Sequence, residues 1–158
     1  MKKIFNEEQQ KLFVLSLTKA CLEYGNGTGK PFEDVLKEDV FPNEASEEFE
    51  EAVCITLFTL KEQGYIGGMV ELVYETETDP DTFEVTELDT LDTPMCTFAD
   101  ISITPKGESY LSGDGFQKAG KDFFEKAKPI IKCIALTALQ VAVETVITAG
   151  LRAAGVNV

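Results

Sequence analysis

Carboxylates are the side chains with the greatest chemical potential in this sequence, and they are unevenly distributed. The 158 residues include 28 Asp and Glu against 14 Lys and Arg, a net charge of −14. Residues 33–100 hold 20 of the acids and 2 bases, Lys37 and Lys61, and so carry 2 − 20 = −18. Such a field repels phosphate and favours a cationic partner, a basic protein surface, or solubility alone.

Side chains of the usual catalytic constellations are missing. The chain has no His, its Ser residues lie in no recognisable nucleophile elbow, and its acids fall on polar helix faces or in turns. Cys21, Cys54, Cys96 and Cys133 are widely spaced without a CxxC pair, which indicates buried reduced thiols instead of a zinc site. We therefore expect a protein that is not an enzyme and that uses no cofactor and no metal.

The stretch from Glu44 to Tyr65 must display the acids, and its spacing predicts a helix with two faces. One face carries the core-facing stripe Phe49, Val53, Thr56, Leu57 and Leu60. The opposite face carries carboxylates around two apolar side chains, an arrangement typical of a binding anchor with a polar rim. With the acids that follow in the chain, the expected partner-binding residues are Glu44, Glu48, Glu51, Ile55, Phe58, Glu62, Glu75, Glu77, Asp79 and Asp81.

The N-terminal part predicts two more helices. Asn6 is a candidate cap for a helix that ends at Tyr24, before the glycines of GNGTGKP. Those glycines lack the spacing of a phosphate-binding loop, so they predict a turn. A short second helix runs from Pro31 to about Asp39. The first helix has apolar residues on two sides and therefore needs cover on both flanks.

After Tyr65 the apolar residues alternate with a period of two. The segments MVELVYET, TFEVTEL and TFADISIT predict strands. The turn TDPDT separates the first two strands, and the acidic connection LDTLDTP precedes the third. We expect a two- or three-stranded wing with a long tip.

The order helix, helix, helix, hairpin is the winged-helix order. The last strand runs into ITPKGESYL, and the central helix ends in KEQGYI. These motifs resemble those of the YjcQ-like group of small phage and prophage proteins over roughly residues 6–112. The resemblance implies an α+β winged-helix domain over residues 1–112, in which Thr104 caps a short helix and Lys106 and Gly107 shape its first turn.

Residues 116–158 form a separate C-terminal helical region in this interpretation. An amphipathic pattern over 116–132 places Phe116, Phe123, Ala127 and Ile130 on one face, and Pro129 kinks or restarts the helix. The following segment, 133–151, is far more apolar. Its small residues recur at spacings that permit close helix approach, which predicts a self-association seam of Ala135, Ala138, Ala142, Thr145 and Ala149.

Burial of residues 133–151 has three possible forms: against the spare flanks of the first and central helices, against the same helix of another subunit, or in a membrane. The length nearly suffices for a membrane span, and lysines precede it. Gln140 and Glu144 oppose that option, because a carboxylate at the bilayer centre costs about 2.5–3.5 kcal/mol. We therefore favour packing within the chain or between subunits.

These features predict a cytoplasmic, homo-oligomeric phage-type protein that binds a protein with a basic surface. The N-terminus lacks the apolar run of a signal peptide. In a sharper form, rows of carboxylates imitate phosphates and occupy the nucleic-acid channel of a host CRISPR or restriction machine, so the chain is a DNA mimic. The alternative is a transcriptional regulator that dimerises through the C-terminal helix. Direct nucleic-acid binding is disfavoured, because Glu48 and Glu51 would face the groove.

Overall fold

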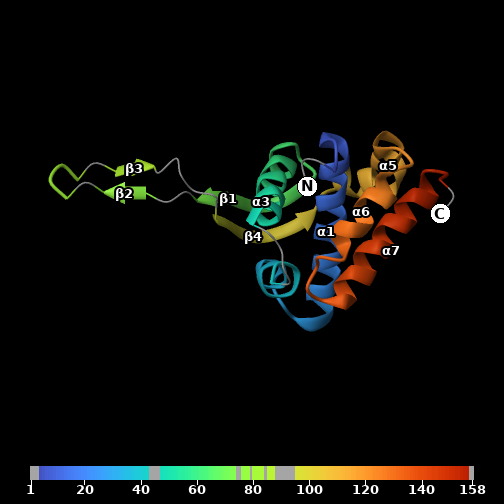
Figure 1. Cartoon of the computed structure of the whole chain (residues 1–158), viewed down its shortest axis with the longest axis horizontal. Helices are drawn as coiled ribbons and strands as arrows, with labels where there is room; N and C mark the ends of the chain where they lie inside the picture. Colours follow the sequence, from blue (N-terminus) through green and yellow to red (C-terminus); the bar gives the residue numbers. More distant parts are fainter. Residues whose placement is uncertain are drawn as a thin grey trace.

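The computed structural model describes residues 4–42, 47–73, 76–78, 80–83, 85–87 and 95–156. The fold is mixed α+β: helices surround one central helix, and an antiparallel strand pair projects from their side (Figure 1). This confirms the expected α+β class.

The elements of the first part follow one another in this order: α1 (Glu7–Thr28), α2 (Phe32–Asp34), the π-helical η1 (Val35–Val40), α3 (Glu47–Glu62), β1 (Ile66–Val73), β2 (Thr76–Thr78), β3 (Val85–Glu87) and β4 (Met95–Ile103). The second part consists of α4 (Pro105–Ser109), the π-helical η2 (Tyr110–Asp114), α5 (Gly115–Ala119), α6 (Phe123–Ile131) and α7 (Thr137–Ala153).

Helix α1 is the centre of the molecule. Every residue from Leu12 to Thr18 is buried, because α3 contacts one flank of the helix and α5 and α7 contact the others. The expected need for cover on both flanks is thus confirmed. Asn6 begins the helix with a reciprocal capping box to Gln9, as the sequence indicated.

The predicted end of α1 at Tyr24 is wrong. The helix continues through Gly25 and stops at Gly29, whose φ of 75° gives the left-handed C-cap. After Gly29 the chain turns back over the end of the helix. A Cβ on Gly25 would overlap the carbonyl of Lys30, so this helical position requires glycine. This glycine therefore permits a close backbone approach instead of ending the helix. The expected second helix is present as α2 and η1, after Pro31 as N-cap residue.

The strands form two short ladders. β1 pairs with β4 antiparallel, and β2 pairs with β3 antiparallel. A three-stranded wing is not found among the residues that the structure describes, so that version of the prediction is wrong. The two middle strands continue outward, beyond the end of the β1–β4 ladder, instead of folding back beside it (Figure 1).

The C-terminal helices differ from the expected pattern in their breaks. The chain bends at Gly120, where φ is 90°, while Pro129 lies inside α6 without ending it. This bend brings the rings of Phe116 and Phe123 together in the core, 5.9 Å apart and nearly perpendicular. Within the apolar segment 133–151, helix α7 begins at Thr137.

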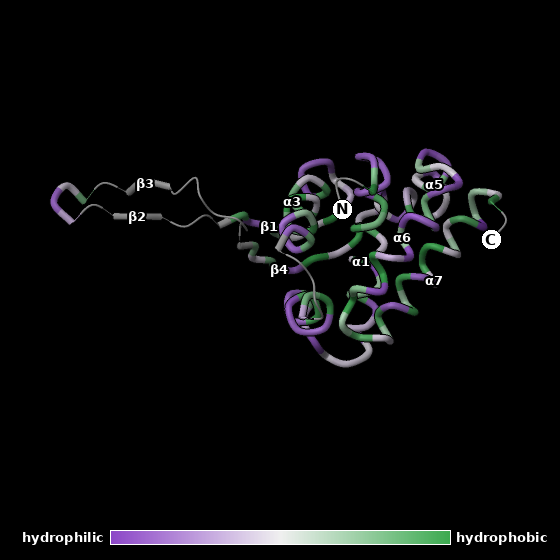
Figure 2. Tube along the Cα trace, viewed as in Figure 1, coloured by the Kyte–Doolittle hydropathy of each residue, from purple (hydrophilic) through white to green (hydrophobic). Residues whose placement is uncertain are grey.

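Helix α7 packs along α1. Its Leu139, Val143, Ile147 and Leu151 are buried in the same core cluster as Leu12 and Leu15 of α1. Hydropathy colouring shows α7 as hydrophobic over much of its length (Figure 2). The segment 133–151 therefore uses the flank of α1, the first of its three expected burial sites. Among the helices that the structure describes, none is long and apolar enough to cross a membrane.

The cysteines are mostly as expected. Cys21, Cys54 and Cys96 are buried and free, but Cys133 is exposed, which corrects the expectation for that residue. Cys133 lies in the turn between α6 and α7, where its thiol donates a 3.5 Å hydrogen bond to the carbonyl of Pro129. A turn on the surface leaves its side chain open to solvent.

Candidate protein-binding surfaces

Helix α3 turns its acids outward because its other side is fixed in the core. The predicted core stripe is buried throughout, as the exposure of Phe49, Val53, Thr56, Leu57 and Leu60 shows. Thr56 also accepts a 2.8 Å hydrogen bond from the side-chain amide of Gln10 on α1. These contacts fix the rotation of α3 about its own axis, so the positions between them face away from the core.

Three predicted acids lie on this outer side. Glu48 and Glu62 are exposed and Glu51 is half-buried. Within the described part of the chain, none of the three forms an ion pair. Their negative charge is therefore available to a cationic partner.

The two predicted apolar anchors are less prominent. Phe58 is half-buried and packs against the core cluster. Ile55 is half-buried and lines a groove of about 320 Å³ between α1 and α3, opposite Phe5 and Lys11. The two apolar side chains thus line a groove or pack on the core instead of projecting as anchors.

The remaining predicted acids lie on the wing or outside the described residues. Glu77 is on β2, and Asp81 is in the exposed turn between β2 and β3. This end of the wing projects well beyond α3 (Figure 1). Glu44, Glu75 and Asp79 lie outside the described residues. The acids on α3 and the acids on the wing therefore form two separate groups.

Sequence reasoning missed Phe83 at the wing turn. Its side chain is 79% exposed, and its backbone has φ of 57°, the left-handed conformation that bulky residues rarely adopt. The sequence predicts the turn TDPDT but places the hydrophobic residue that follows it in a strand, whereas the structure places it before β3. Periodicity alone cannot show that such a residue lies in a turn.

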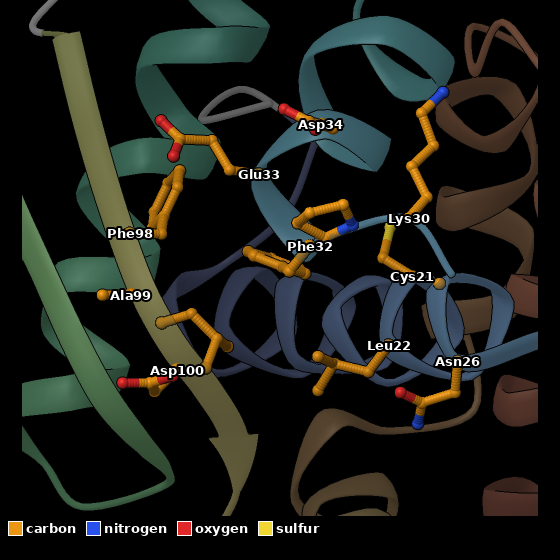
Figure 3. Close-up of a pocket in the computed structure, with 13 residues that line it drawn as sticks. Cys21, Leu22, Asn26, Lys30, Phe32, Glu33, Asp34, Phe98, Ala99 and Asp100 are labelled. Carbon is orange, nitrogen blue, oxygen red and sulfur yellow. The ribbon is translucent and has the colours of Figure 1, made fainter. Parts of the chain in front are cut away.

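A second missed feature is a pocket between the end of α1, α2 and β4, which we call the α1–β4 pocket (Figure 3). Its volume is about 430 Å³. Phe32 and Phe98 meet in it, 5.5 Å apart and nearly perpendicular. Leu22 and Ile101, both half-buried, complete an apolar floor. The residues come from three distant segments, so the sequence pattern offered no signal for the pocket.

The rim of the α1–β4 pocket is acidic. Glu33, Asp34 and Asp100 lie on it with one base, Lys30 (Figure 3). The Lys30 ammonium is already neutralised, because it lies 3.0 Å from the carboxylate of Glu38 and 2.9 Å from that of Asp39. Hydrogen bonds to Asp39 and Glu38 raise the pKa of Lys30 above its ordinary value. The ammonium is thus occupied outside the cavity.

The three rim acids differ in their partners. Glu33 forms a 2.7 Å ion pair with Lys37. Asp34 and Asp100 are exposed, and neither forms an ion pair with any residue that the structure describes. The rim therefore has unneutralised negative charge above an aromatic floor.

A β-bulge sets the position of Asp100. Gly67 pairs with Ser102 and Met69 pairs with Ala99, so β4 contains one residue more than β1 between these pairs. Asp100 is left-handed there, with φ of 53°, and Gly68 opposite has φ of 97°. A Cβ on Gly68 would overlap the carbonyl oxygen of Asp100, so the bulge requires glycine at this position.

Four residues of the predicted self-association seam lie on the side of α7 that points away from α1, whereas Ala135 precedes the helix and its amide donates a hydrogen bond to the carbonyl of Val40. Ala138, Thr145 and Ala149 are exposed, and Ala135 and Ala142 are half-buried. Val141 beside them is 57% exposed. This side of α7 is uncovered by the described part of the chain, and its small residues would let a second helix approach closely.

Several exposed bases lie in the part of the chain from α5 to the end of α7. Lys118, Lys121, Lys132 and Arg152 are exposed and form no ion pair with described residues. The acidic and basic surfaces thus belong to different elements. Comparison of the chain with protein-family models, with curated proteins and with solved structures found no match.

Proposed function

We propose that this chain is a non-catalytic protein of winged-helix type that acts by binding a partner protein with a basic surface. The observation that carries the proposal is the outer side of α3. Glu48, Glu51 and Glu62 are directed away from the core and have no cationic partner among the described residues. Beside them lies the groove lined by Ile55, which offers apolar area to the same partner.

The order of the elements supports the winged-helix part of the proposal. α1, α2 with η1, and α3 precede the β1–β4 hairpin, and α3 packs against β1. After β4, Thr104 caps α4 by accepting a 3.2 Å hydrogen bond from the amide of Gly107. A side chain at Gly107 would overlap the carbonyl of Tyr65, which explains the glycine of the PKG motif.

In the sharper form of the proposal, the acids imitate nucleic-acid phosphates and block a host nucleic-acid-handling machine of CRISPR or restriction type. Two spatially separate acidic groups, on α3 and on the wing, suit an extended cationic channel better than a small basic patch. The chain then binds in the cytoplasm, as an oligomer formed through the exposed seam of α7. Such binding must weaken with salt, because the charges are exposed.

The experiment is a pull-down of tagged protein from nuclease-treated host lysate, at low and high salt. The test variant reverses two charges on α3, Glu48→Lys with Glu51→Lys. The matched control reverses two exposed acids on α6 and α7, Glu125→Lys with Glu144→Lys. We expect the test variant to lose a nucleic-acid-handling enzyme that the wild type and the control retain at low salt. Equal recovery by all three proteins would contradict the proposal.

A DNA-binding regulator is the second candidate, and one observation favours it. The exposed bases Lys118, Lys121, Lys132 and Arg152 could contact phosphates. In that case double-stranded DNA binds in a gel-shift assay, and Lys118→Gln with Lys121→Gln weakens the binding. The α3 double reversal would then strengthen DNA binding instead of removing a protein partner.

A further inference from the structure

The α1–β4 pocket has the chemistry of a site for one long cationic side chain. We propose that it binds an arginine side chain of a basic protein partner. The inference rests on the proposed function and deepens it, because it specifies the partner chemistry and a second contact away from the outer side of α3.

The floor of the pocket suits the aliphatic part of such a side chain. Phe32, Phe98, Leu22 and Ile101 form an apolar surface below the rim, and Phe98, Leu22 and Ile101 are only half-buried by the fold itself. Arginine and lysine commonly lay their methylene groups on such surfaces while the charged end stays among polar groups. The pocket volume of about 430 Å³ is ample for one side chain and for ordered water.

The aromatic rings favour a cation over a neutral side chain. In Figure 3 the Phe98 ring lies next to the Glu33 carboxylate, and the Phe32 ring lies on the α2 side of the same cavity. A guanidinium over the half-buried Phe98 ring would gain cation–π attraction while it approaches that carboxylate, which it would share with Lys37. Arginine is preferred to lysine, because its planar guanidinium can stack on a ring and bind a carboxylate with two parallel hydrogen bonds.

The rim supplies the countercharge. Asp34 and Asp100 stand without ion pairs among the described residues, whereas Lys30 is held by Glu38 and Asp39. A bound cation therefore need not displace an existing pair at either aspartate. The wide mouth keeps these groups solvated, so the affinity for a single side chain is weak, with a Kd of about millimolar.

The test is an NMR titration of the full chain with the peptide acetyl-Gly-Gly-Arg-Gly-Gly-amide. Its control contains citrulline, which keeps the shape of arginine but is neutral. The test variant is Asp34→Asn with Asp100→Asn; asparagine tolerates the left-handed backbone at position 100, so the bulge is retained. The matched variant, Glu125→Gln with Glu144→Gln, removes the same charge from exposed positions on α6 and α7.

We expect the arginine peptide to shift the amide signals of residues 21–34 and 96–101, and the citrulline peptide to shift none of them. The aspartate variant should bind about ten-fold more weakly, whereas the matched variant should bind within about two-fold of wild type. Equal effects of arginine and citrulline, or equal weakening in both variants, would overturn the inference. If the arginine peptide shifts none of these amide signals while the chain still binds its protein partner through Glu48 and Glu51 in a salt-sensitive way, the inference is overturned but the proposed function stands.

Discussion

The hydroxyl of Tyr110 donates a 2.6 Å hydrogen bond to the carboxylate of Glu8 and so joins η2 to the first turn of α1. The Tyr110 hydrogen bond, assisted by Lys11, holds the pKa of Glu8 below its ordinary value of 4.5. Burial, with the hydrogen bond to Glu8, raises the pKa of Tyr110 above its ordinary value of 10. The contact therefore contributes stability that depends on pH at both ends of the range.

Replacement of Tyr110 by Phe should remove this contribution. The stability that comes from the lowered pKa of Glu8 is fully present above pH 4.5 and is lost as the pH falls through that pKa. The stability that comes from the raised pKa of Tyr110 is fully present below pH 10 and is lost as the pH rises through that pKa. Because the Glu8 side chain is 42% exposed, the loss at pH 7 should be only about 1 kcal/mol. Urea unfolding at pH 3, 7 and 10.5 measures the difference in unfolding free energy between the wild type and Tyr110→Phe. The same difference at all three pH values would contradict a pH-dependent contribution from this hydrogen bond.

Gly150 is the position where α7 comes closest to α5. A Cβ on Gly150 would overlap the ring of Phe116, which is fully buried. Gly150→Ala should therefore destabilise the protein by about 1–3 kcal/mol through overpacking.

The matched control is Gly27→Ala in α1. A Cβ there meets no other atom within 4 Å, so the same substitution should stabilise the helix by a few tenths of a kcal/mol, up to about 1. Thermal unfolding of the two variants should move in opposite directions. A Gly150→Ala variant as stable as the wild type would show that the packing between α5 and α7 is looser than described. Equal destabilisation by both variants would show that the effect does not come from the overlap with Phe116.

The sequence allowed elements to be predicted where one period continued over many residues. The buried stripe of α3 and the cap at Asn6 were predicted, because they depend on neighbours in the chain, and the resemblance implied the cap at Thr104. The end of α1 was not predicted, because Gly25 looks like a helix stop and serves a close approach to Lys30. Local sequence cannot distinguish those two uses of glycine.

The α1–β4 pocket shows the same limit for the candidate site. Its aromatic floor joins Phe32 to Phe98, residues far apart in the chain. Its acidic rim depends on a one-residue bulge at Asp100, whose only sequence trace is the glycine pair at 67 and 68. The α3 acids were predictable because a helix face follows from spacing alone.

The four thiols should differ sharply in reactivity. Cys133 is exposed, whereas Cys21, Cys54 and Cys96 are buried. Burial, with the nearby charge of Asp39, raises the pKa of the Cys21 thiol to about 12, so it stays protonated at neutral pH.

A thiol reagent at pH 7.5 should therefore modify one group rapidly in the native protein and all four after unfolding. Mass spectrometry of the labelled peptides should identify Cys133. The Cys133→Ser variant should lose the fast phase completely. A fast phase that persists in this variant would show that a second cysteine is accessible in the native protein.

The uncovered side of α7 should mediate self-association. Ala138 and Thr145 are exposed, so charges placed there cost little folding stability but prevent close helix approach. We expect light scattering to show a defined oligomer for the wild type and a monomer for Ala138→Lys with Thr145→Lys. Gln117→Lys, an exposed position on α5, should keep the wild-type mass. A monomeric wild type would remove this role from α7.

Phe83 offers a test of the wing turn. Its φ of 57° suits Asn and strongly disfavours a β-branched residue. Phe83→Asn should therefore increase the protection of β2 and β3 amides against hydrogen exchange, and Phe83→Val should decrease it. With the side chain 79% exposed, neither variant should shift the unfolding of the helical part by more than about 0.5 kcal/mol. Protection that falls equally in both would indicate that the ring itself holds the turn.

The burial of the middle of α1, from Leu12 to Thr18, also affects when the molecule can fold. Its Leu12 and Leu15 share the core with Leu139 and Val143 of α7, which are more than a hundred residues later in the chain. Because the ribosome makes α1 well before α7, the flank of α1 that α7 covers stays open to water or to a chaperone in the meantime. Completion of the core must therefore wait until α7 has been made, and products that lack α7 should be substrates for proteolysis.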